Sequence, residues 1–185
     1  MTTSSSVETR LPLRSKKLWR LAALATMASL ALTGCSAPGS ETTELVFFVV
    51  SEEPVFIEGS AEGTTIGDIR SRSFESFATE EQARAGEEPL TTSWTTMATV
   101  VDEDVEKQTD VRSLTGHATF NDGSSLTWLG SGELELGKVP AVGDSHTYVV
   151  VGGTGKYFGA RGTSSWTLVD VDTLIYRNVF TLILE

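Results

Sequence analysis

The chain has 185 residues, and its 25 Asp and Glu outnumber its 14 Lys and Arg to give a formal net charge of −11 at pH 7. This acidic balance argues against binding to nucleic acids or to anionic lipid surfaces, because both select patches of Lys and Arg. Cys35 is the single cysteine, so we expect the fold to be held by packing and hydrogen bonds without an internal disulfide.

An export signal is predicted over residues 1–34. Five basic residues precede an apolar stretch from Leu21 to Leu32, which is the order found in secretory signal peptides. The stretch is too short to span a bilayer, since a spanning helix needs roughly 20 apolar residues. The run Leu32-Thr33-Gly34-Cys35 resembles the lipobox of bacterial lipoprotein precursors, and this resemblance implies cleavage before Cys35 and lipid attachment to it. An ordinary secretory signal followed by a chance cysteine is the alternative.

The remaining chain is predicted to be a tethered single domain. Residues 35–185 carry 9 Lys and Arg against 24 Asp and Glu, so membrane contact is expected to come from the lipid alone. This predicts a cell-envelope protein, anchored on the outer side of the cytoplasmic membrane or in the periplasm. Residues 35–43 are small and polar, as is typical of a flexible tether, and residues 44–185 have the length of one domain with a real core.

Short runs rich in Thr, Val and aromatic residues predict strands from Glu44 onward. Asn121-Asp122-Gly123 is the clearest hairpin turn, because its residues tolerate positive φ. Residues 78–89 are expected to form a loop or a short helix. The eight predicted strands are Leu45–Val50, Ile66–Phe77, Trp94–Val101, Val111–Phe120, Ser125–Leu129, Thr147–Val151, Thr163–Val169 and Leu174–Leu184. Eight strands at this spacing indicate an all-β barrel or sandwich.

The last predicted strand, Leu174–Leu184, is apolar at both alternating sets of positions. A half-solvated sheet would alternate apolar with polar residues, so burial on both faces fits a small barrel that packs against other subunits. Arg177 stands in the middle of this strand, and an unpaired buried guanidinium would be costly. Two roles stay open for Arg177: an ion pair at a subunit seam, or a polar anchor for a ligand inside the barrel.

Two segments resemble the dirigent protein family. They are Asp122–Gly130, DGSSLTWLG, and Val150–Gly162, VVGGTGKYFGARG, and the second is also similar to a stretch of the plant allene oxide cyclases. The resemblance extends over about residues 44–184 and implies an eight-stranded antiparallel barrel that forms a trimer and holds a small molecule in its cavity. We interpret the glycines of the second segment as structural, and expect Gly153 and Gly155 to be required for folding in a tight turn with positive φ.

Candidate site residues follow from this resemblance and from the strand pattern. Alignment with the plant cyclases places Val49 and Ser51 where that family has an inward-pointing glutamate and asparagine, so the carboxylate of the family is missing. Trp128 and Tyr148 are aromatic strand residues and further candidates for a cavity lining. His117 is a second candidate polar group beside Arg177, with a hydrogen-bonded structural histidine as the alternative. The sequence contains no hydrolase triad motif and no metal-site motif, and no cofactor is expected.

The sequence therefore predicts a lipid-anchored envelope protein whose barrel binds an apolar small molecule and directs its cyclisation or stereochemistry. Catalysis of this kind excludes water and fixes orientation, so it needs few titratable residues. If the protein is an enzyme, we expect an isomerase, a cyclase or a dirigent-type activity. The alternative is a non-catalytic envelope lipoprotein that binds a ligand or another protein.

Overall fold

The structure is a computed structural model of the chain, and it describes residues 42–59, 64–135 and 140–184. The predicted signal peptide, Cys35 and most of the predicted tether lie outside the described residues. The first strand begins at Thr42, two residues before the predicted start of the domain.

No helix among the described residues has the length and apolar character needed to cross a membrane.

Strands dominate the described part of the chain. Its elements are β1 (Thr42–Ser51), β2 (Val55–Ile57), β3 (Ile69–Phe77), α1 (Glu80–Ala85), β4 (Thr91–Asp104), β5 (Thr109–Phe120), β6 (Ser125–Glu135), β7 (Ser145–Thr154), η1 (Gly155–Tyr157), β8 (Arg161–Asp170) and β9 (Ile175–Ile183). Each of the eight predicted strands overlaps one of these, and α1 lies in the segment predicted as a loop or short helix. The three-residue strand β2 was not predicted.

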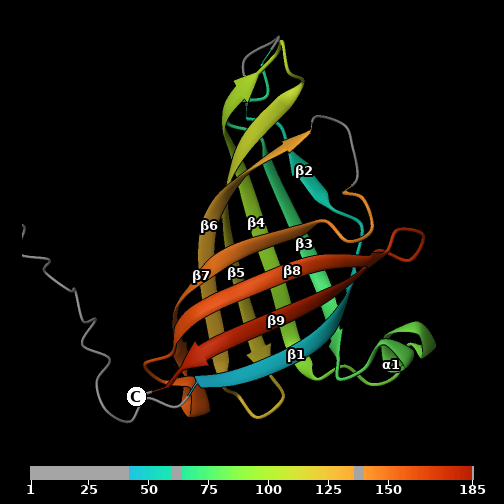
Figure 1. Ribbon diagram of the computed structural model, residues 1–185, viewed down its shortest axis with the longest axis vertical. Coiled ribbons are helices and arrows are strands. Elements are labelled where there is room, and N and C mark those ends of the chain that lie inside the picture. The colour runs from blue at the N-terminus through green and yellow to red at the C-terminus, as the bar shows by residue number, and fades with distance from the viewer. Residues whose placement is uncertain (1–41, 60–63, 136–139, 185) are drawn as a thin grey trace, which may run out of the picture. The chain divides into compact units, whose positions relative to one another are not determined.

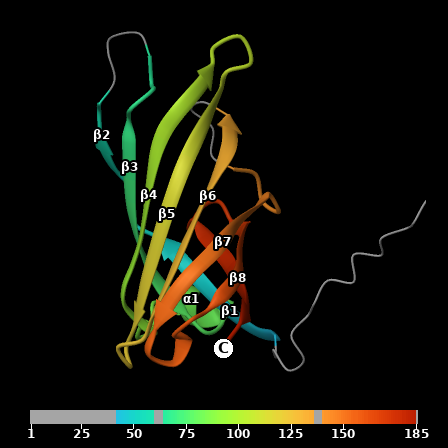
Figure 2. The same cartoon turned by 90° about the vertical axis from the view of Figure 1, so that its left-hand side faces the viewer.

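The strands form a closed antiparallel barrel, which confirms the predicted fold. The sheet order is β1-β9-β8-β7-β6-β5-β4-β3-β2, and β1 also pairs with β3, so eight strands close on themselves (Figures 1 and 2). β2 adds to the edge of β3 outside this closed set. The predicted turn at Asn121-Asp122-Gly123 joins β5 to β6, with Gly123 at φ 80°.

The barrel is closed only along part of its height. The β1–β3 pairing runs from Phe48 and Phe77 to Ser51 and Phe74, where β1 ends. On the other side, the pairing of β6 with β7 runs between Ser125–Leu129 and Val149–Thr154, although β6 continues to Glu135. The hairpin of β4 and β5 therefore rises beyond the closed strands, as the upper part of Figure 1 shows. We call the end that contains Trp94, Trp128 and Phe180 the closed half, and the end that contains Arg70, Arg72 and Arg112 the open half.

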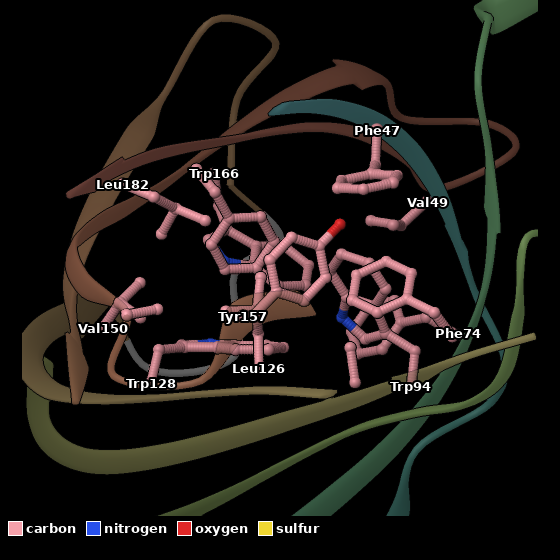
Figure 3. Close-up of a cluster of buried hydrophobic side chains, with 14 residues drawn as sticks. Phe47, Val49, Phe74, Trp94, Leu126, Trp128, Val150, Tyr157, Trp166 and Leu182 are labelled. Atoms are coloured by element: carbon pink, nitrogen blue, oxygen red, sulfur yellow. The ribbon is translucent and has the colours of Figure 1, made fainter. Parts of the chain in front are cut away.

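Aromatic side chains fill the closed half (Figure 3). The rings of Trp94 and Trp128 lie 5.5 Å apart between centroids, and Phe180 lies 5.3 Å from Trp128. Gly116 makes this packing possible, because a Cβ there would lie 2.0 Å from the Trp128 indole. The closed half is thus a packed aromatic core.

Part of the outer apolar face is covered by the chain itself. Ala83 of α1 forms a second buried cluster with Phe77 and Ile175, and Ile175 is 1% exposed although it points away from the barrel interior. The sequence analysis explained the apolar pattern on both faces of β9 by contacts with other subunits. Contacts within one chain account for part of this pattern. Ile183, at the other end of β9, is 42% exposed, and oligomerisation stays a prediction.

The glycine-rich segment departs from the predicted turn. Gly152 and Gly153 lie within β7, and positive φ begins only at Gly155, at 59°. Gly153 is required by close approach instead, because a Cβ on it would lie 2.5 Å from the carbonyl oxygen of Ser125 and 2.6 Å from that of Tyr157.

Candidate functional site

A cavity of about 170 Å³ lies inside the open half of the barrel. Phe74 and Trp166, which belong to both the cavity lining and the buried core, form its floor with ring centroids 5.2 Å apart. Tyr176 stands against both rings, 6.5 Å from Phe74 and 6.1 Å from Trp166. Aromatic edges and faces presented in this way suit a flat, apolar ring system.

The floor is held in a fixed orientation by a buried polar contact. The Trp166 indole Nε1 donates a hydrogen bond to the Ser164 Oγ at 3.0 Å, and the Asn178 Nδ2 donates to the same oxygen at 2.9 Å. Ser164 and Asn178 are fully buried. Because a buried hydrogen-bonded network resists rearrangement, the Trp166 ring has a fixed orientation at the surface of the cavity.

Tyr148 forms another wall and provides a hydroxyl group. Gly130 on the neighbouring strand gives its ring room, since a Cβ at that position would lie 2.9 Å from the Tyr148 Cδ1. Burial raises the pKa of the Tyr148 phenol, with the positive charge of Arg112 acting in the opposite direction. The phenol therefore stays protonated at neutral pH and is available as a hydrogen-bond donor.

Three arginines and a histidine line the rest of the open half. Arg70 and Arg72 of β3, Arg112 of β5 and His146 of β7 all contribute to the cavity lining. Arg70 and Arg72 alternate with Ser71 and Ser73 along β3, so they share the inward face with Phe74.

One buried carboxylate partly neutralises this group. Asp110 is 0% exposed, and its Oδ2 accepts a hydrogen bond from the Arg112 Nη2 at 2.8 Å. The Arg112 Nε lies 2.7 Å from Oδ1 without the direction of a hydrogen bond, and the Arg70 Nη2 lies 4.0 Å from Oδ2. No carboxylate of the described residues forms an ion pair with Arg72.

The electrostatic environment of Arg70 reflects this surplus of positive charge. Burial lowers the pKa of its guanidinium, and the nearby charges of Arg112 and Arg72 lower it further, while Asp110 raises it. The guanidinium stays charged, since arginine does not deprotonate in proteins. Repulsion among the three arginines is therefore only partly offset within the described residues.

Of the residues proposed for the cavity, the structure places only Tyr148 in its lining. Val49 and Trp128 do point inward, but both are 0% exposed in the packed closed half. Ser51 lies at the end of β1, where its Oγ donates to the backbone oxygen of Glu52 at 2.9 Å. The cavity is thus nearer the open end than the alignment with the plant cyclases predicts.

The two candidate catalytic residues lie on the outer face. Arg177 is exposed and pairs in register with Phe48 and Thr167, whereas its neighbours on β9 point inward: Asn178 is buried and Tyr176 lines the cavity. An anchoring role inside the barrel is incompatible with this placement. His117 is also exposed, and its ring nitrogens lie 3.0 Å from the Thr127 Oγ1 and 3.2 Å from the Thr119 Oγ1, the arrangement of a hydrogen-bonded structural histidine.

The sequence analysis missed the arginines, although a signal for them exists. Arg70 and Arg72 have the same strand parity as Phe74, and Asp110 and Arg112 have the same parity as Ala118 and Phe120. Charges that fall on the apolar face of a strand point into the interior. Taking every second residue along each strand, starting from its buried aromatic residue, would have identified these charged residues as inward-pointing.

The lining consists mainly of aromatic, aliphatic and basic side chains. Within the described residues, the cavity lining contains no Cys, Asp or Glu. The same residues include no group of three or more His, Cys, Asp or Glu side chains able to hold a metal ion. The acidic run that begins at Asp102 lies near the tip of the β4–β5 hairpin, where Asp104 forms an ion pair with Lys107 at 2.7 Å.

Comparison with known proteins supports the fold assignment. No family model matches the sequence, and no curated protein matches it. Among solved structures, a pterocarpan synthase dirigent protein is 17% identical with a TM-score of 0.54, over 79% of this chain and 92% of that chain. A pyocyanin demethylase is 11% identical with a TM-score of 0.55, over 76% of this chain and 99% of that chain.

A third similar structure is a nonspecific heme-binding cyclase that catalyses a cycloaddition during neoabyssomicin biosynthesis. It is 12% identical with a TM-score of 0.55, over 80% of this chain and 66% of that chain. At these identities the similarity establishes a shared barrel architecture, and function must be argued from the site. This chain has the barrel fold found in dirigent proteins and in this cyclase.

Proposed function

We propose that this protein is a lipid-anchored envelope protein whose barrel binds an apolar small molecule in the open half and directs its cyclisation or stereochemistry. The observation that carries the proposal is the aromatic floor, where Phe74 and a hydrogen-bonded Trp166 border a cavity of about 170 Å³. Dirigent proteins and a cyclase with the same architecture support it.

The proposed chemistry needs orientation more than acid and base groups. A flexible apolar ligand held against fixed aromatic rings loses most of its conformers, and fixing reacting groups in this way lowers a barrier substantially. The apolar walls exclude water from a reactive intermediate. Tyr148 and His146 supply the hydrogen-bonding groups that orient the ligand.

The lipid anchor is proposed from the sequence run Leu32-Thr33-Gly34-Cys35. A lipid at Cys35 would hold the acidic domain at a membrane that its own surface charge does not favour. Subunit assembly, expected from the resemblance to dirigent proteins, is part of the same proposal.

A pair of neighbouring substitutions tests the cavity. Ala98 lines the cavity, and Met97 beside it is 51% exposed on the outer face. Ala98→Phe should fill the cavity and abolish binding of a hydrophobic probe such as naphthalene-1-methanol in calorimetry, whereas Met97→Phe should leave binding unchanged. Equal binding by both variants would contradict a ligand site in the open half.

A carrier without catalysis is the second candidate, and the absence of carboxylates from the described lining favours it. Native mass spectrometry of the purified protein, followed by identification of any co-purified molecule, separates the two. A carrier leaves its ligand chemically unchanged after incubation. A cyclase converts the ligand, and a dirigent-type protein changes the stereochemistry of the products that the ligand forms.

A further inference from the structure

The basic residues are distributed unevenly over the domain. Residues 35–185 contain 9 Lys and Arg among 24 Asp and Glu. Arg70, Arg72 and Arg112, a third of these basic residues, line one cavity, and no acidic residue does so within the described chain. In a chain of this composition, three cations at one site indicate a local requirement for positive charge.

The contacts of the arginines show which of them is available to a ligand. Asp110 engages Arg112 through both oxygens and lies 4.0 Å from Arg70. The side chains of Arg112 and Arg70 are 13% and 25% exposed, so their charges are held in a partly desolvated wall. Arg72 lies nearer the aromatic floor, two residues from Phe74, and has no ion-pair partner among the described residues.

We propose that the ligand of this barrel carries an oxyanion, of which a carboxylate is the best match, and that Arg72 binds it. The planar guanidinium offers two parallel N–H donors that fit both oxygens of a carboxylate. Arg70 and Arg112 strengthen this site through their charge, and Asp110 fixes Arg112 in position. The inference rests on the proposed function, because the apolar body of the same ligand occupies the aromatic floor.

Local geometry explains how an acidic protein selects an anion. At physiological ionic strength, dissolved salt screens the effect of the acidic outer surface on a ligand more than about 8 Å away. The arginines that line the partly buried cavity attract an anion more strongly, because the effective dielectric constant there is lower than in water. One carboxylate would relieve the repulsion that the three arginines exert on each other. The apolar part of the ligand supplies the affinity, and the oxyanion fixes which end faces the arginines.

Two matched probes test the inference by calorimetry: naphthalene-1-carboxylate and naphthalene-1-methanol, which share the ring and differ in charge. In the wild-type protein we expect the carboxylate to bind at least tenfold more tightly. Arg72→Gln should bring the two affinities together while the affinity for naphthalene-1-methanol stays unchanged, which also shows that the cavity is intact. Arg177→Gln, on the outer face, is the matched control and should keep the tenfold preference.

The outcomes separate the inference from the function on which it rests. If neither probe binds the wild-type protein, the proposed function itself fails. If both bind equally, the barrel remains a ligand site and the oxyanion assignment is overturned. If the preference survives Arg72→Gln, the role given to Arg72 is wrong. Should Arg72→Gln fail to fold, Arg72→Lys replaces it and is expected to keep only part of the preference, since it lacks the two-pronged donor.

Discussion

At the scale of single residues, Gly153 offers the sharpest test of the packing. A Cβ there would lie 2.5 Å from one backbone oxygen and 2.6 Å from another, while a Cβ on the adjacent Gly152 would meet nothing within 4 Å. We expect Gly153→Ala to lower the free energy of unfolding by about 1–3 kcal/mol, as overpacking does, and Gly152→Ala to change it by less than about 0.5 kcal/mol. Urea denaturation of the two variants measures the difference, and equal losses would show that Gly153 is not constrained.

A second residue-scale prediction concerns pH. Asp122 in the β5–β6 turn accepts hydrogen bonds from Lys156 and from both the hydroxyl and the backbone N–H of Ser124. The Lys156 ion pair, followed by the Ser124 hydrogen bonds, holds the pKa of the Asp122 carboxyl well below its ordinary value. A carboxyl of lowered pKa stabilises the fold above its unfolded-state pKa, and this contribution is lost as pH falls toward the folded value.

The Asp122→Asn variant should therefore melt at a lower temperature than the wild-type protein at pH 7. The gap should narrow as pH falls below about 4, the ordinary range of an aspartate pKa. The effect should be small, because the pair is solvent-exposed. Asp172→Asn, in the β8–β9 turn, is the control. A melting gap that is constant with pH would contradict the linkage.

Residue placement inside the barrel was predictable only in part. The aromatic character of the interior followed from composition and strand pattern, and Tyr148, one of the residues proposed for the cavity, lies in its lining. The choice of which aromatic residues pack and which border a cavity depends on where β1 stops pairing with β3. This pairing joins strands that are far apart in the sequence. The local residue pattern therefore could not show that Trp128 and Val49 pack in the core while Tyr148 lines the cavity.

At the scale of elements, α1 depends on its cap and its contacts. A helix of six residues is unstable in isolation, and here Thr79 accepts a hydrogen bond from the Gln82 backbone while the Gln82 side chain accepts one from the Thr79 N–H. Arg84 ties the helix to Asp170 at the end of β8. The helix in turn helps to cover Ile175 on the outer face of β9.

We expect Thr79→Ala to lower the free energy of unfolding by about 0.5–2 kcal/mol, the usual cost of a lost N-cap. Thr79→Ser keeps the capping oxygen and should lose much less. Because α1 lies outside the barrel, both variants should bind the cavity probes with wild-type affinity. Urea denaturation and calorimetry measure the two effects, and a loss of probe binding in Thr79→Ala would show that the helix shapes the cavity.

Most elements were predictable because each strand carries its own local signal. Alternation and β-branched residues predicted all eight barrel strands. The strand β2 was not predicted, because three residues are too few to show an alternation of apolar and polar positions. Its apolar side chains are all 55–62% exposed, so they do not mark a buried face either. Strand ends were less certain, since β4 and β6 extend beyond their apolar cores as more polar segments.

At the scale of the domain, the packed core and the proposed ligand site occupy different halves of one barrel. The closed half buries the largest aromatic cluster, and the open half places arginines beside a cavity. Trp166 belongs to both, because it packs against Trp94 and also lines the cavity. Substitutions of core residues should therefore reduce stability and binding together, whereas a substitution of Arg72, which has no ion-pair partner among the described residues, should change binding alone.

For the whole molecule, the decisive prediction concerns Cys35. If the lipobox resemblance holds, the wild-type protein should lack residues 1–34, carry a lipid mass on Cys35 and sediment with membranes. Cys35→Ser removes the thiol that the lipid requires, so the variant should keep the mass of the precursor or be released from the membrane. Ser36→Ala, the adjacent change, should behave as wild type. Mass spectrometry and membrane fractionation measure both effects. A Cys35→Ser protein with the same mass and sedimentation as the wild-type protein would contradict lipid attachment at Cys35. Any membrane association of this acidic domain, with its 24 Asp and Glu, would then need another cause.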